Sequence, residues 1–235
     1  MQKTRNRVAR QKVEKRRPTR PKVRLDANAR PLQDRARSTY DSILQAAGEL
    51  LAEVGIERLS TNLVCKRAGL TPPALYRYFP NKYALLKELG ARLMSAQDSV
   101  VFDWQDRGEN TGPTSIRGMA DARRHILYDV NRVTKAFPGG GWVMRALRAV
   151  PTLSAVRIAS REMVAERDFA ALAKRYPRAD RCVLRIAATL CVEVSYAALE
   201  LVTDQPELDA DLVMQEISHM VALYVDSFAK PRAKK

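Results

Sequence analysis

The chain of 235 residues is long enough for one or two domains, and its hydrophobic content of 46% is typical of a protein with a packed core. It has no apolar run of about 18 residues and no apolar stretch behind its basic N-terminus, so neither a membrane span nor a signal peptide is predicted. Three cysteines without a CxxC pattern favour a reducing, cytoplasmic compartment.

The net charge of +15 is concentrated near the N-terminus, because residues 1–37 hold 14 Lys and Arg but only 3 Asp and Glu. Residues 1–36 show almost no apolar periodicity and contain three prolines, so they are predicted to form a disordered basic arm. Such an arm would neutralise DNA phosphates and could enter a minor groove. The alternative is a solubilising extension without a specific role.

The first predicted helix begins near Ser38, which forms a capping-box-like pattern with Asp41. A second, short helix is predicted over residues 62–68, with Thr61 as its cap. In that helix Leu63, Val64 and Ala68 are expected to face the core. Gly69 follows where a helix end favours a residue tolerant of positive φ, so a tight turn is predicted there.

The next predicted helix begins after Thr71 and extends to Phe79, with Pro72 and Pro73 in its first turn. Leu75 and Phe79 face inward in this pattern, which leaves Thr71, Pro72, Tyr76, Arg77 and Tyr78 facing outward. A short helix with this exposed face fits a DNA major groove, where arginine can bond guanine. The alternatives are that both tyrosines are core residues and that Arg77 is only a solvated charge.

Asn81 is predicted to cap a third helix, which places Lys82 and free N–H groups at a helix start that attracts phosphate. The start of the earlier helix, at Thr61 and Asn62, offers the same kind of site. These two N-termini are expected to hold the DNA backbone on either side of the recognition helix.

The segment Ala-Gly-Leu-Thr-Pro-Pro-Ala-Leu-Tyr-Arg-Tyr-Phe-Pro-Asn-Lys-Tyr-Ala-Leu-Leu, with the preceding Leu-Ser-Thr, resembles the DNA-binding domain of the tetracycline-repressor (TetR) family. The resemblance covers residues 37 to about 89. It implies that the DNA-binding residues include Thr61, Thr71, Tyr76, Tyr78 and Lys82, with Pro72, Pro73 and Arg77 at the groove. It also implies dimers that pack through their last two helices and respond to a small-molecule ligand.

The rest of the chain is predicted to be helical, because no segment shows sustained period-two alternation. The helix from Asn81 continues toward Trp104, and further helices are expected over residues 115–136, 142–150 and 152–176. Two final helices carry apolar stripes, from Val183 to Leu201 and from Val213 to Phe228. These stripes suit a symmetric four-helix dimer interface, although they could instead close the core of each monomer.

These helices could enclose an apolar ligand pocket, although each candidate residue taken singly fits a core position better than a pocket wall. The candidate lining residues are Tyr128, Trp142, Met163, Phe169 and Tyr196. Glu193 and Glu200 are expected to be solvated or paired with an arginine such as Arg145 or Arg148, or else turned toward a ligand. His125 and His219 are isolated, and no serine has a nucleophile-elbow context, so no metal, cofactor or catalytic site is predicted.

Read with this resemblance, the sequence predicts an all-α, non-enzymatic, cytoplasmic homodimer that represses transcription from an inverted-repeat operator on double-stranded DNA. The resemblance alone implies that a small apolar effector releases it. The predicted parts are a basic arm (1–36), a helix-turn-helix domain (37–84), a ligand-binding and dimerisation domain (85–229) and a basic tail (230–235). One alternative is a weakly specific, chromosome-organising DNA-binding protein that uses the arm. Another is an enzyme with a DNA-binding head.

Overall fold

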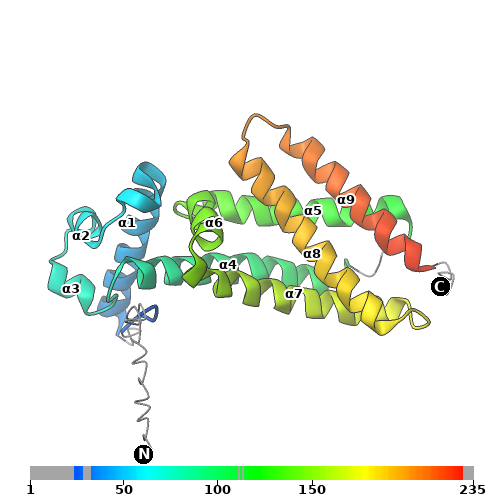
Figure 1. Cartoon of the computed structure of the whole chain (residues 1–235), viewed down its shortest axis with the longest axis horizontal. Coiled ribbons are helices and arrows are strands. Elements are labelled where there is room, and N and C mark those ends of the chain that lie inside the picture. Colours follow the sequence, from blue (N-terminus) through cyan, green and yellow to red (C-terminus); the bar gives the residue numbers. More distant parts are fainter. Residues whose placement is uncertain (1–23, 29–32, 111, 113, 230–235) are drawn as a thin grey trace, which may run out of the picture.

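The computed structural model describes residues 24–28, 33–110, 112 and 114–229, and the ordered elements among them are all helical (Figure 1). The predicted all-α fold is therefore confirmed. The α helices are α1 (Asp34–Arg58), α2 (Thr61–Ala68), α3 (Pro72–Tyr76), α4 (Lys82–Asp106), α5 (Ile116–Ala136), α6 (Gly140–Ala149), α7 (Ser154–Arg175), α8 (Arg181–Asp204) and α9 (Ala210–Asp226). Short 3₁₀ turns lie at Pro151–Leu153 and Ser227–Ala229.

The first helix begins earlier than the sequence predicts. Gln33 is its N-cap, and Asp34 adds a favourable negative charge to its first turn. Ser38 therefore lies inside the helix, where its carbonyl accepts a bond from Ser42 Oγ at 2.8 Å. Asp41 lies two turns into the helix and pairs with Arg92 of α4 at 2.7 Å. The capping box predicted at Ser38 is wrong.

Residues 24–28, which the sequence places in a disordered arm, instead lie against the N-terminal helices. The side chain of Asn28 donates to the carbonyl of Tyr76, and Lys87 pairs with Asp26 at 2.7 Å. Ala27 packs against the hydrophobic core. Residues 33–36 of the predicted arm form the cap and first turn of α1. Residues 1–23 and 29–32 of the arm and the predicted tail 230–235 lie outside the described residues.

Helix α4 runs from the N-terminal helices along the length of the larger helical region (Figure 1). One buried face holds Leu85, Leu89 and Leu93 near the N-terminal helices and Trp104 at the far end. These residues belong to a single hydrophobic cluster that extends from Tyr40 in α1 to Met214 in α9. The same helix is therefore part of both predicted domains.

A close approach between α1 and the α5–α6 turn joins the two regions. A Cβ atom added at Gly48 would lie 2.4 Å from the carbonyl oxygen of Pro138, a distance that real Cβ contacts do not show. Gly139 follows with a φ of 64° in the left-handed region, and it faces the carbonyl of Gly48. Nearby, Trp142 of α6 packs beneath Gly55 of α1. Helix α1 and the α5–α6 turn therefore meet without room for a side chain at Gly48 or at Gly139.

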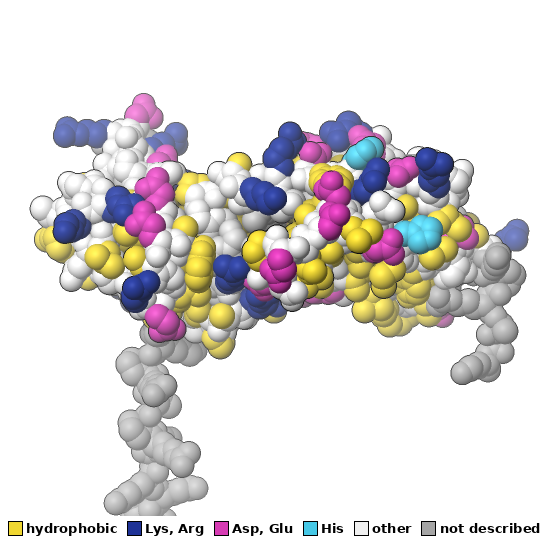
Figure 2. Space-filling model, turned by 90° about the horizontal axis from the view of Figure 1, so that it is seen from above, with side chains coloured by type: hydrophobic (Ala, Val, Ile, Leu, Met, Phe, Trp, Pro, Cys, Tyr) yellow, Lys and Arg dark blue, Asp and Glu magenta, His cyan; other side chains and the backbone are white. Residues whose placement is uncertain are grey.

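Helices α8 and α9 close the molecule at the end away from α2 and α3 (Figure 1). Helix α8 is long and apolar enough, by length and composition, to cross a membrane, and half of that stretch is buried within the chain itself. Its outer face and that of α9 expose large apolar side chains, which gather in the right-hand part of Figure 2. These side chains are Ile186, Leu190, Val194, Leu201, Leu212, Met220 and Leu223.

Candidate DNA interface

Helix α2 and the turn after it form the first half of a helix-turn-helix. Ser60 caps α2 by accepting a bond from Leu63 N at 3.3 Å, so Thr61, predicted as the cap, is the first helical residue instead. The left-handed turn at Gly69 is confirmed, with φ 66° and ψ 31°. Leu63 is 38% exposed and does not face the core, because α2 buries only its neighbours Val64 and Cys65.

Helix α3, the predicted recognition helix, is shorter than expected. Pro72 and Pro73 occupy its first turn as predicted, and Thr71 stands at the N-cap without a side-chain hydrogen bond. The helix ends at Tyr76, and both Tyr78 N and Phe79 N then bond the same carbonyl, that of Leu75. The predicted extension to Phe79 is wrong, because the chain turns there and does not continue the helix.

The exposed face of α3 matches most of the predicted DNA-contact residues. Thr71, Pro72, Pro73 and Arg77 are exposed, and Tyr76 keeps 44% of its surface accessible. The Tyr76 hydroxyl lies 3.0 Å from Thr61 Oγ1, so the start of α2 and the end of α3 are joined by a hydrogen bond. Hydroxyl and guanidinium groups on one accessible surface can bond phosphates and base edges.

Tyr78 departs from the prediction, since only 7% of its surface is exposed. Its ring packs edge-on against Tyr40 of α1 at a centroid distance of 5.7 Å. The outward prediction counted helical offsets from Leu75 and Phe79, but α3 has already ended at Tyr76. For Tyr78 the core alternative is therefore correct.

The start of α4 provides the second phosphate-attracting end. Asn81 caps it as predicted and accepts bonds from Tyr83 N at 2.9 Å and Ala84 N at 3.0 Å. Lys82 is half-buried, and its ammonium group donates to the carbonyl of Ile56 at 3.3 Å. Asn62, at the start of α2, is exposed. The two helix starts on which the predicted phosphate clamp depends are both formed.

Not every cation of the helix-turn-helix is available to DNA. Arg67 is held by Glu53 at 2.6 Å and by Glu49 at 3.5 Å, both on α1. The hydrogen bond from Arg67 lowers the pKa of Glu53 below its ordinary value. Lys66 and Arg77 are exposed cations of α2 and the α3 turn that lie outside these ion pairs. The α1 carboxylates thus fix α2 in place, an arrangement that the sequence analysis missed.

Among the cavities between the helices of the larger region, two share a wall, and their volumes are about 600 Å³ and 380 Å³ including their open mouths. We call them the outer and the inner cavity. Trp104, Arg123 and Asp168 line both. The indole Nε1 of Trp104 is buried and has no hydrogen-bond partner within the described part of the chain, and Asp168 accepts a bond from Gln105 at 2.8 Å. This shared wall is polar, whereas leucine, valine, methionine and alanine side chains supply apolar surface.

Of the five predicted pocket residues, only Tyr196 lines either of these cavities. Met163 is 51% exposed on α7, which contradicts its predicted place in a pocket. Phe169 belongs to a small separate core cluster, and Trp142 stacks with Arg145 at 4.9 Å near α1. Tyr128 is half-buried outside both cavity walls. Helical periodicity places a residue on a face of its helix but does not say which neighbouring helix covers that face.

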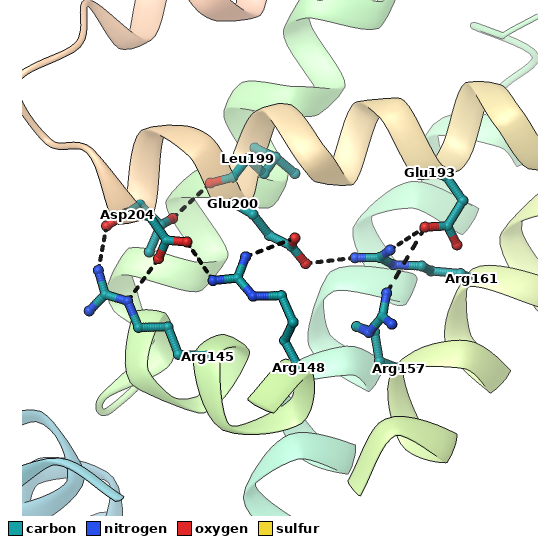
Figure 3. Close-up of polar contacts among 9 residues, drawn as sticks. Arg145, Arg148, Arg157, Arg161, Glu193, Leu199, Glu200 and Asp204 are labelled. Carbon is teal, nitrogen blue, oxygen red and sulfur yellow. Dashed lines mark hydrogen bonds and ion pairs between the residues drawn. The ribbon is translucent and has the colours of Figure 1, made fainter. Parts of the chain in front are cut away.

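A row of ion pairs connects α6 and α7 to one side of α8 (Figure 3). Arg148 bonds Glu200 at 3.0 Å and Arg145 bonds Asp204 at 2.8 Å, which lowers the pKa of Asp204. Arg161 is only 5% exposed and bonds Glu200 at 2.8 Å and also Glu193. The predicted pairing of both glutamates is confirmed, with Arg161 as the missed partner. Among the described residues no group of His, Cys, Asp and Glu could hold a metal ion.

The helix-turn-helix is similar to known proteins. Residues 43–89 match the family model of bacterial regulatory proteins of the tetR family. The chain is 40% identical over 55 residues to the tetracycline repressor protein class A from Escherichia coli, covering 23% of this chain and 26% of that protein. It is 30% identical over 92 residues to the nucleoid occlusion factor SlmA of Actinobacillus pleuropneumoniae serotype 5b, covering 39% and 42%. The chain thus spans about a quarter of the length of the first relatives it matches.

Solved structures match over most of the chain but at low sequence identity. The fatty acid degradation regulator FadR from Bacillus halodurans aligns with a TM-score of 0.59 at 18% identity, covering 78% of this chain and 94% of its own. A tetR-family transcriptional regulator from Streptomyces coelicolor aligns with a TM-score of 0.56 at 15% identity, covering 82% and 83%. These likenesses show a shared fold across both regions of the chain.

Proposed function

We propose that the chain is a homodimeric repressor of the tetR family of bacterial regulatory proteins, which binds an inverted-repeat operator and is released by a small effector. The observation that carries this proposal is the exposed surface of α3. Thr71, Tyr76 and Arg77 lie there together, between two helix starts that attract phosphate.

Arg77 is the residue to which we assign base recognition. It is exposed just beyond the end of α3, and Pro72 and Pro73 leave few hydrogen-bonding groups at the front of that helix. Base preference would therefore depend on the guanidinium of Arg77, on Thr71 and on apolar contact from the prolines. Tyr76, Thr61, Asn62 and Lys82 would bind the phosphate backbone.

The exposed apolar faces of α8 and α9 support the homodimer. Ile186 is 55% exposed, Leu212 54% and Met220 62%, and their neighbours on both helices extend the same surface (Figure 2). Contiguous apolar surface of this kind marks an interaction site on a folded protein. Two copies that pack through these helices would form a four-helix interface. We therefore interpret the half-buried, apolar α8 as a dimer helix.

The outer and inner cavities are the proposed effector site, and α4 is the proposed connection to DNA. The helix begins at the Asn81 cap beside the DNA-facing surface and carries Trp104 in the shared cavity wall. An effector would release DNA only if it binds the DNA-competent dimer less tightly than a second arrangement. The test uses compounds that release the wild-type protein from DNA. If such a compound no longer releases Trp104→Ala but still releases the surface variant Met163→Ala, the result would support this site.

The DNA-binding proposal is tested by selecting bound sequences from random duplexes and footprinting the winners. We expect two inverted half-sites whose centres lie about 34–36 Å apart, or a multiple of that distance. In Arg77→Ala, preference at one base pair per half-site should fall by about 1–3 kcal/mol. Equal weakening on every sequence would show that Arg77 contacts only phosphate.

A second candidate is a weakly specific DNA-binding protein that organises chromosomal DNA. The 14 basic residues within positions 1–37 favour it, as does the likeness to a nucleoid occlusion factor. Footprinting separates the two functions. A chromosome-organising protein should protect long duplexes uniformly, whereas a repressor should protect only the palindrome.

A further inference from the structure

We propose that Asn28 is a positioning residue for DNA binding. Residues 24–28, which we call the strap, cross the end of the recognition helix, and Asn28 holds the backbone on both sides of Arg77. This inference rests on the proposed DNA-binding function and adds to it a residue from outside the helix-turn-helix.

Helix α3 needs outside support because of its length and its ending. It has five residues, so few backbone hydrogen bonds hold it together. The residue four positions after Tyr76 is Pro80, which has no N–H to donate to the Tyr76 carbonyl. The N–H of Phe79, three positions after Tyr76, is already bonded to Leu75. The Tyr76 carbonyl therefore lacks its usual helical partners.

Asn28 supplies the missing donor and a second one. Its side-chain Nδ2 donates to Tyr76 O at 2.9 Å, and its backbone N donates to Tyr78 O at 2.7 Å. These two carbonyls flank Arg77, the exposed residue assigned to the DNA groove. One residue thus fixes the carbonyl of the residue before Arg77 and the carbonyl of the residue after it, which limits how far the backbone at Arg77 can turn.

The strap is itself anchored to the start of α4. Asn81 Nδ2 donates to Arg24 O at 2.7 Å, while the opposite end of the same amide caps the helix. Leu25 and Ala27 are half-buried between the exposed Arg24, Asp26 and Asn28. The strap therefore joins the end of α3 to the start of α4, the two elements expected to meet neighbouring parts of the DNA.

The ion pair of the strap contributes less than Asn28. The Asp26 side chain is 89% exposed, and the hydrogen bond and charge of Lys87 lower its pKa. Exposed pairs of this kind add little to stability because water and salt screen them. Asp26→Asn should therefore leave DNA binding nearly unchanged, and the effect of the strap should depend on Asn28.

The test measures binding of the full chain to its selected operator and to a scrambled duplex. Asn28→Ala should weaken operator binding about three- to tenfold per copy, the range for one neutral hydrogen bond, and leave scrambled-duplex binding unchanged. Asn28→Asp should weaken it more, because an acceptor would then face the Tyr76 carbonyl. Gln33→Ala is the matched control, since Gln33 is an exposed amide that makes no side-chain cap bond to α1.

Hydrogen exchange in the DNA-free protein gives an independent measurement. The amides of Arg77, Tyr78 and Phe79 should exchange faster in Asn28→Ala, whereas the thermal unfolding midpoint should match that of the Gln33→Ala control. Wild-type operator affinity in Asn28→Ala would overturn the inference, and so would equal losses on operator and scrambled DNA. A wild-type protein that prefers no sequence would overturn the proposed function itself, an outcome distinct from either of these.

Discussion

The contact between Gly48 and Pro138 gives a sharp test of how tightly the DNA-binding helices are joined to the rest of the chain. In Gly48→Ala, the new methyl group would begin 2.4 Å from Pro138 O and 2.9 Å from Pro138 C, and ordinary contact starts at 3.4 Å. The backbone of α1 or of the turn must therefore move by about 1 Å, and no flexible side chain can absorb that shift.

Two opposing effects set the magnitude. Overpacking a buried site costs about 1–3 kcal/mol, and a backbone neighbour favours the upper end of that range. Alanine is the better helix former by about 1 kcal/mol, which offsets part of the loss. We therefore expect a net destabilisation of about 2 kcal/mol. For a chain of this size, that corresponds to a fall in unfolding temperature of roughly 4–8 °C.

The assay is urea and thermal unfolding of Gly48→Ala beside Gly141→Ala. At Gly141 the added methyl group meets only the side-chain methyl of Thr203, at 3.0 Å, so the same substitution should be nearly neutral there. If Gly48→Ala proves as stable as the wild type, helix propensity outweighs the steric cost. The turn would then be free to move, and the argument that it locks α1 to α6 would fail.

Three further predictions concern charge. Arg161→Ala removes a 5% exposed guanidinium that bonds Glu200 and Glu193, so the free energy of unfolding should fall by about 3 kcal/mol. Arg132→Ala removes an exposed ion pair and should change the free energy of unfolding little. A loss in Arg161→Ala as small as that in Arg132→Ala would refute the role of burial. Asp98 is 5% exposed with Ser160 as hydrogen-bond donor at 2.6 Å, and burial raises its pKa. Its ionisation therefore costs stability as pH rises from the unfolded-state pKa towards the raised folded-state pKa, and Asp98→Asn should remove that decline. An identical pH profile for the variant would exclude Asp98 as its source. Deleting residues 1–23, which carry 10 basic residues, should make the slope of log affinity against log salt less steep, by about one per lost phosphate contact. The preferred operator sequence should stay the same. An unchanged slope would show that these residues do not contribute to DNA binding.

The sequence predicted best those features that a few adjacent residues encode. The turn at Gly69, the prolines that open α3 and the Asn81 cap each depend on local backbone chemistry, and each is present. Tyr78 was misplaced because its direction depends on where α3 ends and on Tyr40, which lies far away in the sequence. Periodicity alone cannot supply that information.

The same limit explains the missed strap and the misplaced pocket. Asn28 bonds a residue 48 positions later, and Asp26 pairs with one 61 positions later, within a segment whose composition is typical of disorder. The cavity wall combines Trp104, Arg123 and Asp168 from three helices, none of which the aromatic pattern singled out. Contacts that join distant segments are decided by packing, so they became visible only in the folded chain.

The ion pairs along α8 border its exposed apolar stripe. Glu193 is bonded to buried Arg161, yet 45% of its side chain remains accessible, and the exposed Leu190 lies one turn before it on the same face of the helix. If a second copy covers that stripe, the carboxylate becomes part of the interface rim and loses water. Dissolved ions would then act on subunit association as well as on DNA affinity. Titrations of operator binding against salt therefore need protein concentrations far above the dimer dissociation constant to count phosphate contacts alone.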